Sequence, residues 1–478
     1  MRVAVIGAGP AGLTAAFRLA QRGVDVEVLE AGPAVGGLAR SISLWNQTVD
    51  LGPHRFFSKD PRVNAFWLEA VGSAYRMIDR RTRILHDGKL FDYPLRPVNA
   101  LANLGVFEAL RCLGSYARES LHRAEPAETF ETWVVRRFGR RLFEIFFRSY
   151  SEKLWGIPCE RLDAAFAAQR IKGFSLGEAL RDALGLAGVR HPTLVDRFAY
   201  PVGGTGSVYR ELARRIELAG GRVRLRTPVR RVEIDAGRAR GVVLADGEAL
   251  PFDQVISTMP LTLLAQGLPE LPDDVARAAA ELRFRNTLLV YLRIDAGELF
   301  PDQWLYVHSP ELRVGRITNF RNWAPELCAG EEATVLTLEF WCSDGDEIWS
   351  EPDDRSIERA KRELAATGLA GTARAAAGHV VRIRRCYPVY ELGYRRRVAT
   401  IADHLAGIAG LTAIGRYGAF KYNNQDHSIL MGLLAAENLV GEGRHDLWDV
   451  NADYDYHEEA YITATGLEPA AHHAGGAA

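Results

Sequence analysis

The chain has 478 residues, which is too long for one hydrophobic core and predicts two or three domains. Its 47% hydrophobic and 25% charged residues are the proportions of an ordinary water-soluble globular protein. The formal net charge of -1 argues against attraction to nucleic acid or to anionic membranes through the overall field.

The cysteines and the apolar runs indicate a cytoplasmic protein. Five cysteines are scattered without a CxxC pair, which argues against a disulfide framework or a zinc site. HxH and HExxH spacings are absent as well, so no metal is expected. The apolar N-terminus lacks the basic region and cleavage site of a signal peptide. No run approaches the roughly 18 apolar residues of a membrane-spanning helix.

The first thirty residues have the pattern strand, turn, helix, strand. A β-branched run over residues 2–6 predicts a buried strand, and apolar residues at helical spacing predict a helix over 13–22. A second strand is expected over 24–29, directly before Glu30. The turn between the first strand and the helix reads Gly7-Ala-Gly-Pro-Ala-Gly12.

This turn predicts a site for the phosphates of a dinucleotide. Gly7 permits the tight turn, Gly9 lets a pyrophosphate approach the backbone, and Gly12 lets helix and strand pack closely. The N-terminus of the helix offers free N–H groups and the positive end of its dipole. Glu30 is placed to accept hydrogen bonds from ribose hydroxyls.

The residues that follow indicate which dinucleotide is bound. Gly36, Gly37 and Arg40 resemble the extended fingerprint of FAD-binding oxidoreductases of the amine oxidase type, in which these residues also serve the cofactor. The resemblance implies FAD, and the absence of His or Cys beside the turn predicts that it is held non-covalently. A second fingerprint for NAD(P)H is missing, so a nicotinamide reductant would dock only transiently.

Helical and strand patterns alternate along the rest of the chain. Residues 60–190 are largely helical in pattern, and the amphipathic stretch 98–122 predicts a packed helix rather than a membrane anchor. Strand patterns return after residue 200 and again over 282–341.

These patterns predict an α/β fold with α+β insertions. It comprises a discontinuous Rossmann-type FAD-binding domain, a helical insertion domain and an antiparallel-sheet substrate domain. The expected bounds are 1–58, 200–265 and 400–450 for the FAD-binding domain, 59–199 for the helical insertion, 266–399 for the substrate domain, and 451–478 for a C-terminal extension with a disordered tail.

Several segments resemble the UDP-galactopyranose mutases, a family of flavoproteins within the amine oxidase and protoporphyrinogen oxidase superfamily. The resemblance covers most of the chain in patches and is most specific at both ends and around Trp155. The segments that carry it are Asp50–Phe57, Ser149–Gly156, Tyr200–Gly206, Leu282–Arg285, Cys386–Val389 and Gly415–Asp426.

The resemblance implies roles for individual residues. His54 would lie beside the flavin ring, Trp155 would line a sugar-nucleotide pocket, and Arg285, Tyr387 and Tyr422 would contact a diphosphate. The residues assigned to the cofactor at later positions are Val229, Gly415, Arg416 and Asn424.

Physical chemistry leaves alternatives at three of these positions. The imidazole of His54 can tune the charge of a flavin near neutral pH, or can be structural. Arg285 lies in an apolar strand and needs an anion, either a substrate phosphate or a buried aspartate. Trp155 either stacks on a base or sugar or belongs to a core layer.

The chain also departs from the mutase pattern. Phe174 stands where the family has an arginine on a mobile loop, so Arg170 or Lys172 is the candidate substitute. The stretch 174–192 is predicted to be a lid over the substrate. Asn424 stands where the family has an acid near the flavin.

Three functions are compatible with these observations. The first is a UDP-galactopyranose mutase-like isomerase, which interconverts the pyranose and furanose forms of a nucleotide sugar with N5 of the reduced flavin as nucleophile. The second is an FAD-dependent oxidoreductase of the amine oxidase, protoporphyrinogen oxidase or desaturase type. The third, a non-catalytic flavin-binding protein, is disfavoured by the many polar residues at pocket positions. The oligomeric state is left open, a homodimer included.

Overall fold

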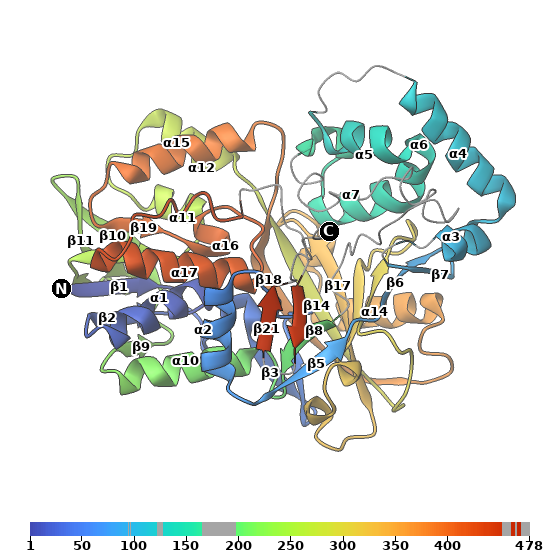
Figure 1. Cartoon of the computed structure of the whole chain (residues 1–478), viewed down its shortest axis with the longest axis horizontal. Coiled ribbons are helices and arrows are strands. Elements are labelled where there is room, and N and C mark those ends of the chain that lie inside the picture. Colours follow the sequence, from blue (N-terminus) through green and yellow to red (C-terminus); the bar gives the residue numbers. More distant parts are fainter. Residues whose placement is uncertain are drawn as a thin grey trace, which may run out of the picture.

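The computed structural model describes residues 1–93, 95, 97–121, 128–164, 197–451, 460–463 and 466–469. Two sheet-centred halves lie side by side, with the N-terminus in one half and a group of helices above the other (Figure 1). Parallel and antiparallel sheets both occur, which confirms the predicted α/β fold class.

The first half is built on a parallel sheet with strand order β19-β13-β1-β2-β9. Its members come from the N-terminal, middle and C-terminal parts of the chain. The five strands are β1 (Arg2–Ile6), β2 (Asp25–Leu29), β9 (Arg222–Arg224), β13 (Gln254–Ser257) and β19 (Leu411–Ala413). The central strand β1 is buried from Val3 to Ile6, as expected for a parallel strand with both faces covered.

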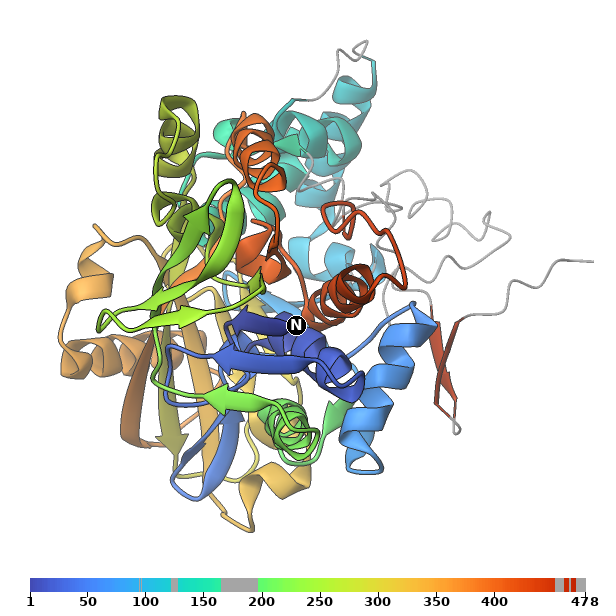
Figure 2. The same cartoon turned by 90° about the vertical axis from the view of Figure 1, so that its left-hand side faces the viewer.

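Helices cover this sheet. Helix α1 (Pro10–Gln21) packs between α17 (Gln425–Val440) and α10 (Gly206–Leu218), an arrangement that Figure 2 shows from the side. Gly432 allows the contact between α1 and α17, because a Cβ atom there would lie 2.5 Å from the carbonyl oxygen of Ala11. Nearby lie α2 (Pro61–Val71), the antiparallel strands β10 (Val229–Asp235), β11 (Arg238–Leu244) and β12 (Ala249–Pro251), and helices α11 (Leu261–Gln266), α12 (Asp273–Glu281), α15 (Tyr394–Ala406) and α16 (Gly415–Gly418).

The second half is built on a seven-stranded sheet with the order β18-β14-β17-β16-β15-β6-β7. The strands are β6 (Thr82–His86), β7 (Lys89–Asp92), β14 (Phe284–Ile294), β15 (Trp304–Val307), β16 (Arg316–Asn319), β17 (Thr334–Cys342) and β18 (Ala375–Pro388). All pairs are antiparallel except β6 with β15.

The two faces of this sheet differ, as the two-residue period of a strand requires. Leu288 and Val290 of β14 pack on one face in a core shared with Leu364 of α14 (Asp353–Thr367). Thr287 on the other face lines a cavity between the halves. Short elements complete this part: β3 (Ser41–Leu44) pairs with β4 (Gln47–Asp50), β5 (Tyr75–Asp79) pairs with β8 (Arg197–Pro201), α13 (Glu347–Ser350) precedes α14, and β20 (Ala460–Thr463) pairs with β21 (Gly466–Pro469).

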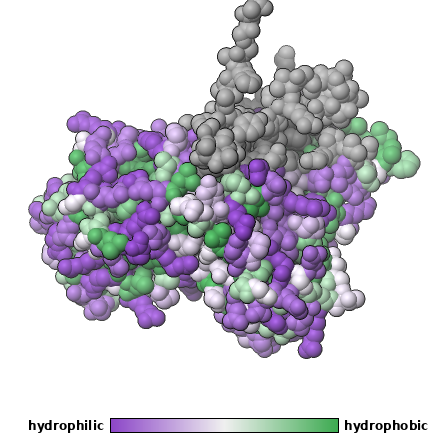
Figure 3. Space-filling model, turned by 60° about the horizontal axis from the view of Figure 1, so that its bottom comes forward, coloured by the Kyte–Doolittle hydropathy of each residue, from purple (hydrophilic) through white to green (hydrophobic). Residues whose placement is uncertain are grey.

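A group of helices lies beside β6 and β7. It contains α3 (Pro97–Leu104), α4 (Val106–Ser120), α5 (Phe130–Phe138), α6 (Arg140–Leu142), a π-helical turn (Phe143–Arg148) and α7 (Ser149–Trp155). α4 forms the outer edge of the molecule in Figure 1, and the same edge is coloured hydrophobic in Figure 3.

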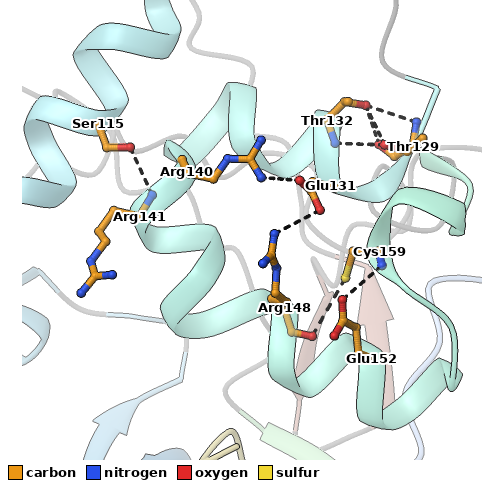
Figure 4. Close-up of polar contacts among 9 residues, drawn as sticks. All are labelled: Ser115, Thr129, Glu131, Thr132, Arg140, Arg141, Arg148, Glu152 and Cys159. Carbon is orange, nitrogen blue, oxygen red and sulfur yellow. Dashed lines mark hydrogen bonds and ion pairs between the residues drawn. The ribbon is translucent and has the colours of Figure 1, made fainter.

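A buried carboxylate ties the inner helices of this group together. Glu131 of α5 is 6% exposed and accepts hydrogen bonds from Arg140 and Arg148, which flank the π-helical turn (Figure 4). Thr129 and Thr132 form a capping box at the start of α5 in the same view. Aromatic residues at helical spacing supply the core, among them Phe138 and Phe146, which are each 2% exposed.

Part of the segment predicted as helical forms strands instead. β5, β6 and β7 lie between residues 75 and 92, and β6 joins the edge of the seven-stranded sheet through β15. Main-chain pairing with a distant strand decided the conformation here, which local spacing in the sequence does not report. The predicted domain bounds themselves stay a prediction.

Candidate functional site

A cavity of about 560 Å³ lies where the parallel sheet meets the seven-stranded sheet. It extends beyond the carboxyl ends of β1 and β2, which is where open α/β sheets bind ligands. We call one part the phosphate end, formed by Gly7, Gly9, Glu30 and Gly37. We call the other part the arginine–tyrosine end, formed by Arg316, Glu339, Tyr387, Arg416 and Tyr422.

The three glycines after β1 have the geometry that their spacing predicts. Gly7 has φ +98°, and a Cβ atom there would lie 2.1 Å from Oγ1 of Thr258. A Cβ atom at Gly12 would lie 2.1 Å from the carbonyl oxygen of Gly7, so the close packing of α1 requires glycine. Gly9 lines the cavity, and a side chain there would meet only the Cα atom of Gly37, at 4.0 Å.

Glu30 is held at the tip of β2. Its Oε2 accepts a hydrogen bond from Ala8 N and its Oε1 accepts one from Gly32 N, both at 2.7 Å. These bonds orient the carboxylate at the cavity wall. Val229, at the start of β10, lines the same wall.

Arg40 lies outside the cavity lining but directly after Ala39, which belongs to it. Its Nε is buried and makes no hydrogen bond with any described residue. A buried guanidinium nitrogen without a partner is costly in a finished protein. Together with the open space at Gly9, this orphaned donor fits a bound anionic cofactor.

His54 lines the cavity in a neutral state. Its Nδ1 lies 2.9 Å from Gly52 O, so Nδ1 carries the proton and donates it. Burial, and then the charges of Arg316 and Arg416, lower its pKa to about 4. The imidazole therefore stays neutral near pH 7, and its assignment to the side of the flavin stays a prediction.

The segment around α16 reaches the cavity as predicted. Gly415 has φ +84°, and Gly415, Arg416 and Asn424 all line the wall. Arg416 is fixed by hydrogen bonds from Nε to Cys386 O (3.0 Å) and from Nη1 to Asn423 O (2.7 Å).

Two tyrosines and Arg416 form one stack at the arginine–tyrosine end. The rings of Tyr387 and Tyr422 are stacked with centroids 5.4 Å apart. The Arg416 guanidinium lies over both rings, 4.9 Å from the centroid of Tyr387 and 4.4 Å from that of Tyr422. Both tyrosines line the cavity, which agrees with their predicted place in the pocket.

Trp155 is a second neighbour of these tyrosines, but it belongs to the core. It is 1% exposed, stacks on Tyr390 and lies outside the cavity lining. Its ring contacts Tyr387 edge-on at 6.4 Å, so Trp155 supports the pocket wall from behind. Of the two alternatives for Trp155, the structure supports a core residue rather than a ring that stacks on a base or sugar.

Arg285 does not reach the cavity either. Its guanidinium donates to the carbonyl oxygens of Lys153, Leu154 and Trp341, and it lies 3.3 Å from the carboxylate of Asp346. The expected anion partner is therefore a protein carboxylate, and the prediction that Arg285 faces a substrate is wrong. Its bonds join the end of α7 to the end of β17, and this long-range pairing has no local signal.

Sequence reasoning missed the cavity's cross-strand ion pair. Arg316 of β16 and Glu339 of β17 are directly opposed in the antiparallel register, and both line the cavity. Arg316 donates from Nε and Nη2 to the two carboxylate oxygens at 2.7 and 2.6 Å, and Nη2 lies 3.4 Å from the Tyr387 hydroxyl. The available signal was Glu339 inside the apolar strand β17, a signal of the same kind as the one that drew attention to Arg285.

Two sequence-predicted substrate residues, Arg170 and Lys172, lie outside the described residues, as does the proposed lid over 174–192.

A family model described as "Flavin containing amine oxidoreductase" matches residues 10–385 of the chain. The chain belongs to this family. The predictions of a flavoprotein and of the amine oxidase superfamily are thereby confirmed. The glycine turn, the open space beside Gly9 and the orphaned Nε of Arg40 are the features of this chain that fit a flavin dinucleotide.

The relatives that match by sequence include carotenoid desaturases, a probable UDP-galactopyranose mutase and L-amino-acid oxidases. The zeta-carotene-forming phytoene desaturase of Myxococcus xanthus is 27% identical over 316 residues, which cover 61% of this chain and 60% of the desaturase. A probable UDP-galactopyranose mutase of Klebsiella pneumoniae is 27% identical over 176 residues, which cover 34% of this chain and 43% of that protein. The chain thus spans about 60% or less of the length of these curated relatives.

A solved structure shows the likeness of the whole fold. The crystal structure of reduced UDP-galactopyranose mutase superposes with a TM-score of 0.81 at 23% identity, covering 95% of this chain and 96% of the mutase. The resemblance in fold that the sequence segments suggested is confirmed over nearly the full length.

Proposed function

We propose that this protein binds FAD non-covalently and acts on a nucleotide sugar as a UDP-galactopyranose mutase-like pyranose/furanose isomerase. The lining of the cavity includes the phosphate end, which suits a dinucleotide, and the arginine–tyrosine end, which suits a second ligand. The resemblance in fold to reduced UDP-galactopyranose mutase supports the same assignment.

The observation that carries this proposal is a pair of fixed guanidinium groups that converge on one tyrosine. Arg316 lies 3.4 Å from the Tyr387 hydroxyl, and Arg416 lies over the Tyr387 ring. Nη1 of Arg316 and Nη2 of Arg416 donate to none of the described residues, although the other guanidinium nitrogens are engaged. Two oriented hydrogen-bond donors, each on a positively charged guanidinium group, are suited to bind a diphosphate.

The charge state of Arg316 follows from its neighbours Glu339 and Tyr387. Burial lowers the pKa of Arg316, but Glu339 and Tyr387 outweigh burial and the net shift is upward, so the guanidinium stays charged. Because Glu339 fixes two of its nitrogens, the third is held in place rather than free to rotate.

Reduced flavin, when bound, supplies a nucleophile at N5, and oxidised flavin supplies a hydride acceptor. The residues of the chain bind and orient the substrate. Arg316 and Arg416 hold the anionic group, Tyr387 and Tyr422 offer hydroxyls and ring faces, and neutral His54 presents an unprotonated Nε2 at the cavity wall.

A panel of substrates tests the proposal. The purified protein is reduced with dithionite without oxygen and offered UDP- and dTDP-hexopyranoses, with the oxidised protein as the matched control. We expect a furanose product under reducing conditions only. If no nucleotide sugar is converted by either form, the isomerase assignment is wrong.

A second candidate is an FAD-dependent oxidoreductase of the amine oxidase, protoporphyrinogen oxidase or desaturase type. Two observations favour it: relatives that match by sequence include phytoene desaturases, and Glu339 neutralises Arg316 within the cavity. In that case oxidised flavin is bleached by an amine, alcohol, porphyrinogen or polyene in the absence of oxygen, and nucleotide sugars leave it unchanged.

A further inference from the structure

Helix α4 carries an apolar stripe that faces away from the protein. At 100° per residue, seven residues fall within one arc of about 120° that contains no polar side chain. All seven are exposed. They are Val106, Phe107, Leu110, Leu113, Gly114, Ala117 and Leu121.

The apolar face of a surface helix usually packs on the protein, whereas the apolar face of α4 is exposed. The predicted helix over 98–122 is therefore packed through its other face. Phe107 is 87% exposed and Leu121, the C-terminal cap, is 86% exposed. Of the ten large hydrophobic side chains exposed among the described residues, five belong to α4 or its cap. Figure 3 shows the resulting hydrophobic edge.

The opposite face of α4 attaches the helix to the protein by polar contacts. Ser115 Oγ accepts a hydrogen bond from Arg141 N at 3.1 Å, and Glu108 pairs with the Arg141 side chain. Cys112 is buried on this face. The helix is therefore anchored without use of its apolar stripe, which remains available to a partner.

We propose that the α4 stripe docks on the surface of an anionic lipid bilayer. Arg111 and Arg118 lie at one border of the stripe. The Arg111 side chain is 74% exposed and lies 3.6 Å from the carboxylate of Glu108, so its outer face is open to a headgroup. An exposed stripe of Phe, Leu and Val bordered by arginine is the composition of helices that lie in the membrane interface, where the cations meet acidic headgroups.

The dimensions of α4 favour docking on a bilayer surface over spanning the bilayer or pairing with a second copy of the chain. Sixteen residues from Val106 to Leu121 extend about 24 Å, short of the roughly 30 Å of a hydrocarbon core. In the part of the chain that the structure describes, no helix is long and apolar enough to cross a membrane. A stripe about 10 Å wide would bury roughly 500 Å² in a symmetric pair of chains, well under the 1,200 Å² or so of a stable dimer.

A chain of contacts links the helix pair α3 and α4 to the wall at the arginine–tyrosine end of the cavity. Tyr93, which follows β7 and is 37% exposed, packs edge-on against Tyr306, with centroids 5.2 Å apart. Tyr306 lines the cavity opposite Arg316 in the strand register. Asn103 of α3 donates to Leu90 O of β7, so α3 ties α4 to this wall.

Flotation with vesicles of phosphatidylglycerol and phosphatidylcholine tests the proposal on the full-length, flavin-loaded protein. We expect the wild type to float with these vesicles. The double variant F107S/L110S should lose at least about 30-fold in partitioning, because two apolar side chains no longer enter the interface. L218S is the matched control, since Leu218 is 73% exposed on α10, and it should float like the wild type.

A second variant separates charge from apolar contact. R111Q/R118Q should lose about 20-fold on vesicles that contain phosphatidylglycerol and should be unaffected on pure phosphatidylcholine. Retained flavin absorbance shows that each variant is folded. The proposal is overturned if the wild type does not float, if F107S/L110S floats equally well, or if light scattering reveals a dimer that this variant dissociates while vesicles bind neither protein.

Discussion

The two ends of the cavity are built on different plans. At the phosphate end, glycine backbone, one carboxylate and a helix N-terminus come from the first forty residues, and hydrogen bonds such as Ala8 N to Glu30 hold them over short sequence distances. At the arginine–tyrosine end, side chains from β16, β17, β18 and the segment after α16 meet across more than one hundred residues. The first plan is fixed by local geometry, and the second depends on strand register.

Substitution at Gly9 should have the largest effect and breaks the phosphate end alone. Gly9→Val places a branched side chain in the open space that we assign to the pyrophosphate, so the purified protein should be colourless. Flavin content per chain is read from absorbance after denaturation. Gly345→Ala is the matched control, because nothing lies within 4 Å of a Cβ atom there. Stoichiometric FAD in Gly9→Val would place the cofactor elsewhere.

Substitution at Arg316 tests the opposite end. Arg316→Lys keeps the charge but loses the planar fork that contacts Glu339 and Tyr387. We expect flavin content to be unchanged and kcat/KM to fall about 100-fold, which corresponds to about 2.7 kcal/mol of lost transition-state stabilisation. The measurement uses the substrate that the panel identifies. Normal turnover would show that the substrate binds without this guanidinium.

Arg285 provides the matched comparison within the same sheet. Arg285→Met removes a charge that bonds three carbonyl oxygens at the junction of α7 and β17. The free energy of unfolding should fall by about 3 kcal/mol, while kcat/KM of the folded enzyme stays within about threefold. Denaturant unfolding measures the effect on stability, and initial rates measure the effect on kcat/KM. A large loss of turnover with intact stability would restore Arg285 to the substrate site.

The smallest expected effect concerns His308, whose ring stacks on Tyr150 with centroids 4.6 Å apart behind the arginine–tyrosine end. Burial, helped by Lys153 and His86, lowers its pKa to about 3, below the value of about 6.5 in the unfolded chain. The unfolded state therefore binds the proton first, and stability falls as the pH drops from 6.5 towards 3.

Between pH 7 and pH 5 this group should cost the wild type about 2 kcal/mol of unfolding free energy. His308→Asn should lose about 2 kcal/mol less than the wild type over the same interval, as measured by urea unfolding at the two pH values. Equal losses in the two proteins would mean that His308 is not buried in its neutral form.

The contrast between the ends also explains what could be predicted from the sequence. The geometry of the phosphate end could be predicted, because turn, helix and strand follow one another within thirty residues. The residues concerned are Gly7, Gly9, Gly12 and Glu30. Gly415 and Arg416, which line the cavity, were assigned to the cofactor from a motif that is likewise local, and this assignment stays a prediction.

Strand register was not accessible in the same way. Arg285 and Arg316 are both charged residues of β-strands, yet Arg316 lies in the cavity opposite Glu339 while Arg285 lies at the junction of α7 and β17. The low pKa of His54 could not be foreseen for the same reason, since its burial and its cationic neighbours come from distant parts of the chain. Likewise, the spacing that makes α4 amphipathic does not say which of its faces meets the protein.

The parallel sheet has a consequence for the order of events during synthesis. β19 (Leu411–Ala413) fills its edge, and Asn424 and Gln425 at the start of α17 line the cavity. The N-terminal glycine turn emerges first from the ribosome, but its pocket has no far wall until some four hundred further residues have been made. We therefore expect the cofactor to be bound late, after the N-terminal and C-terminal parts of the chain have packed together.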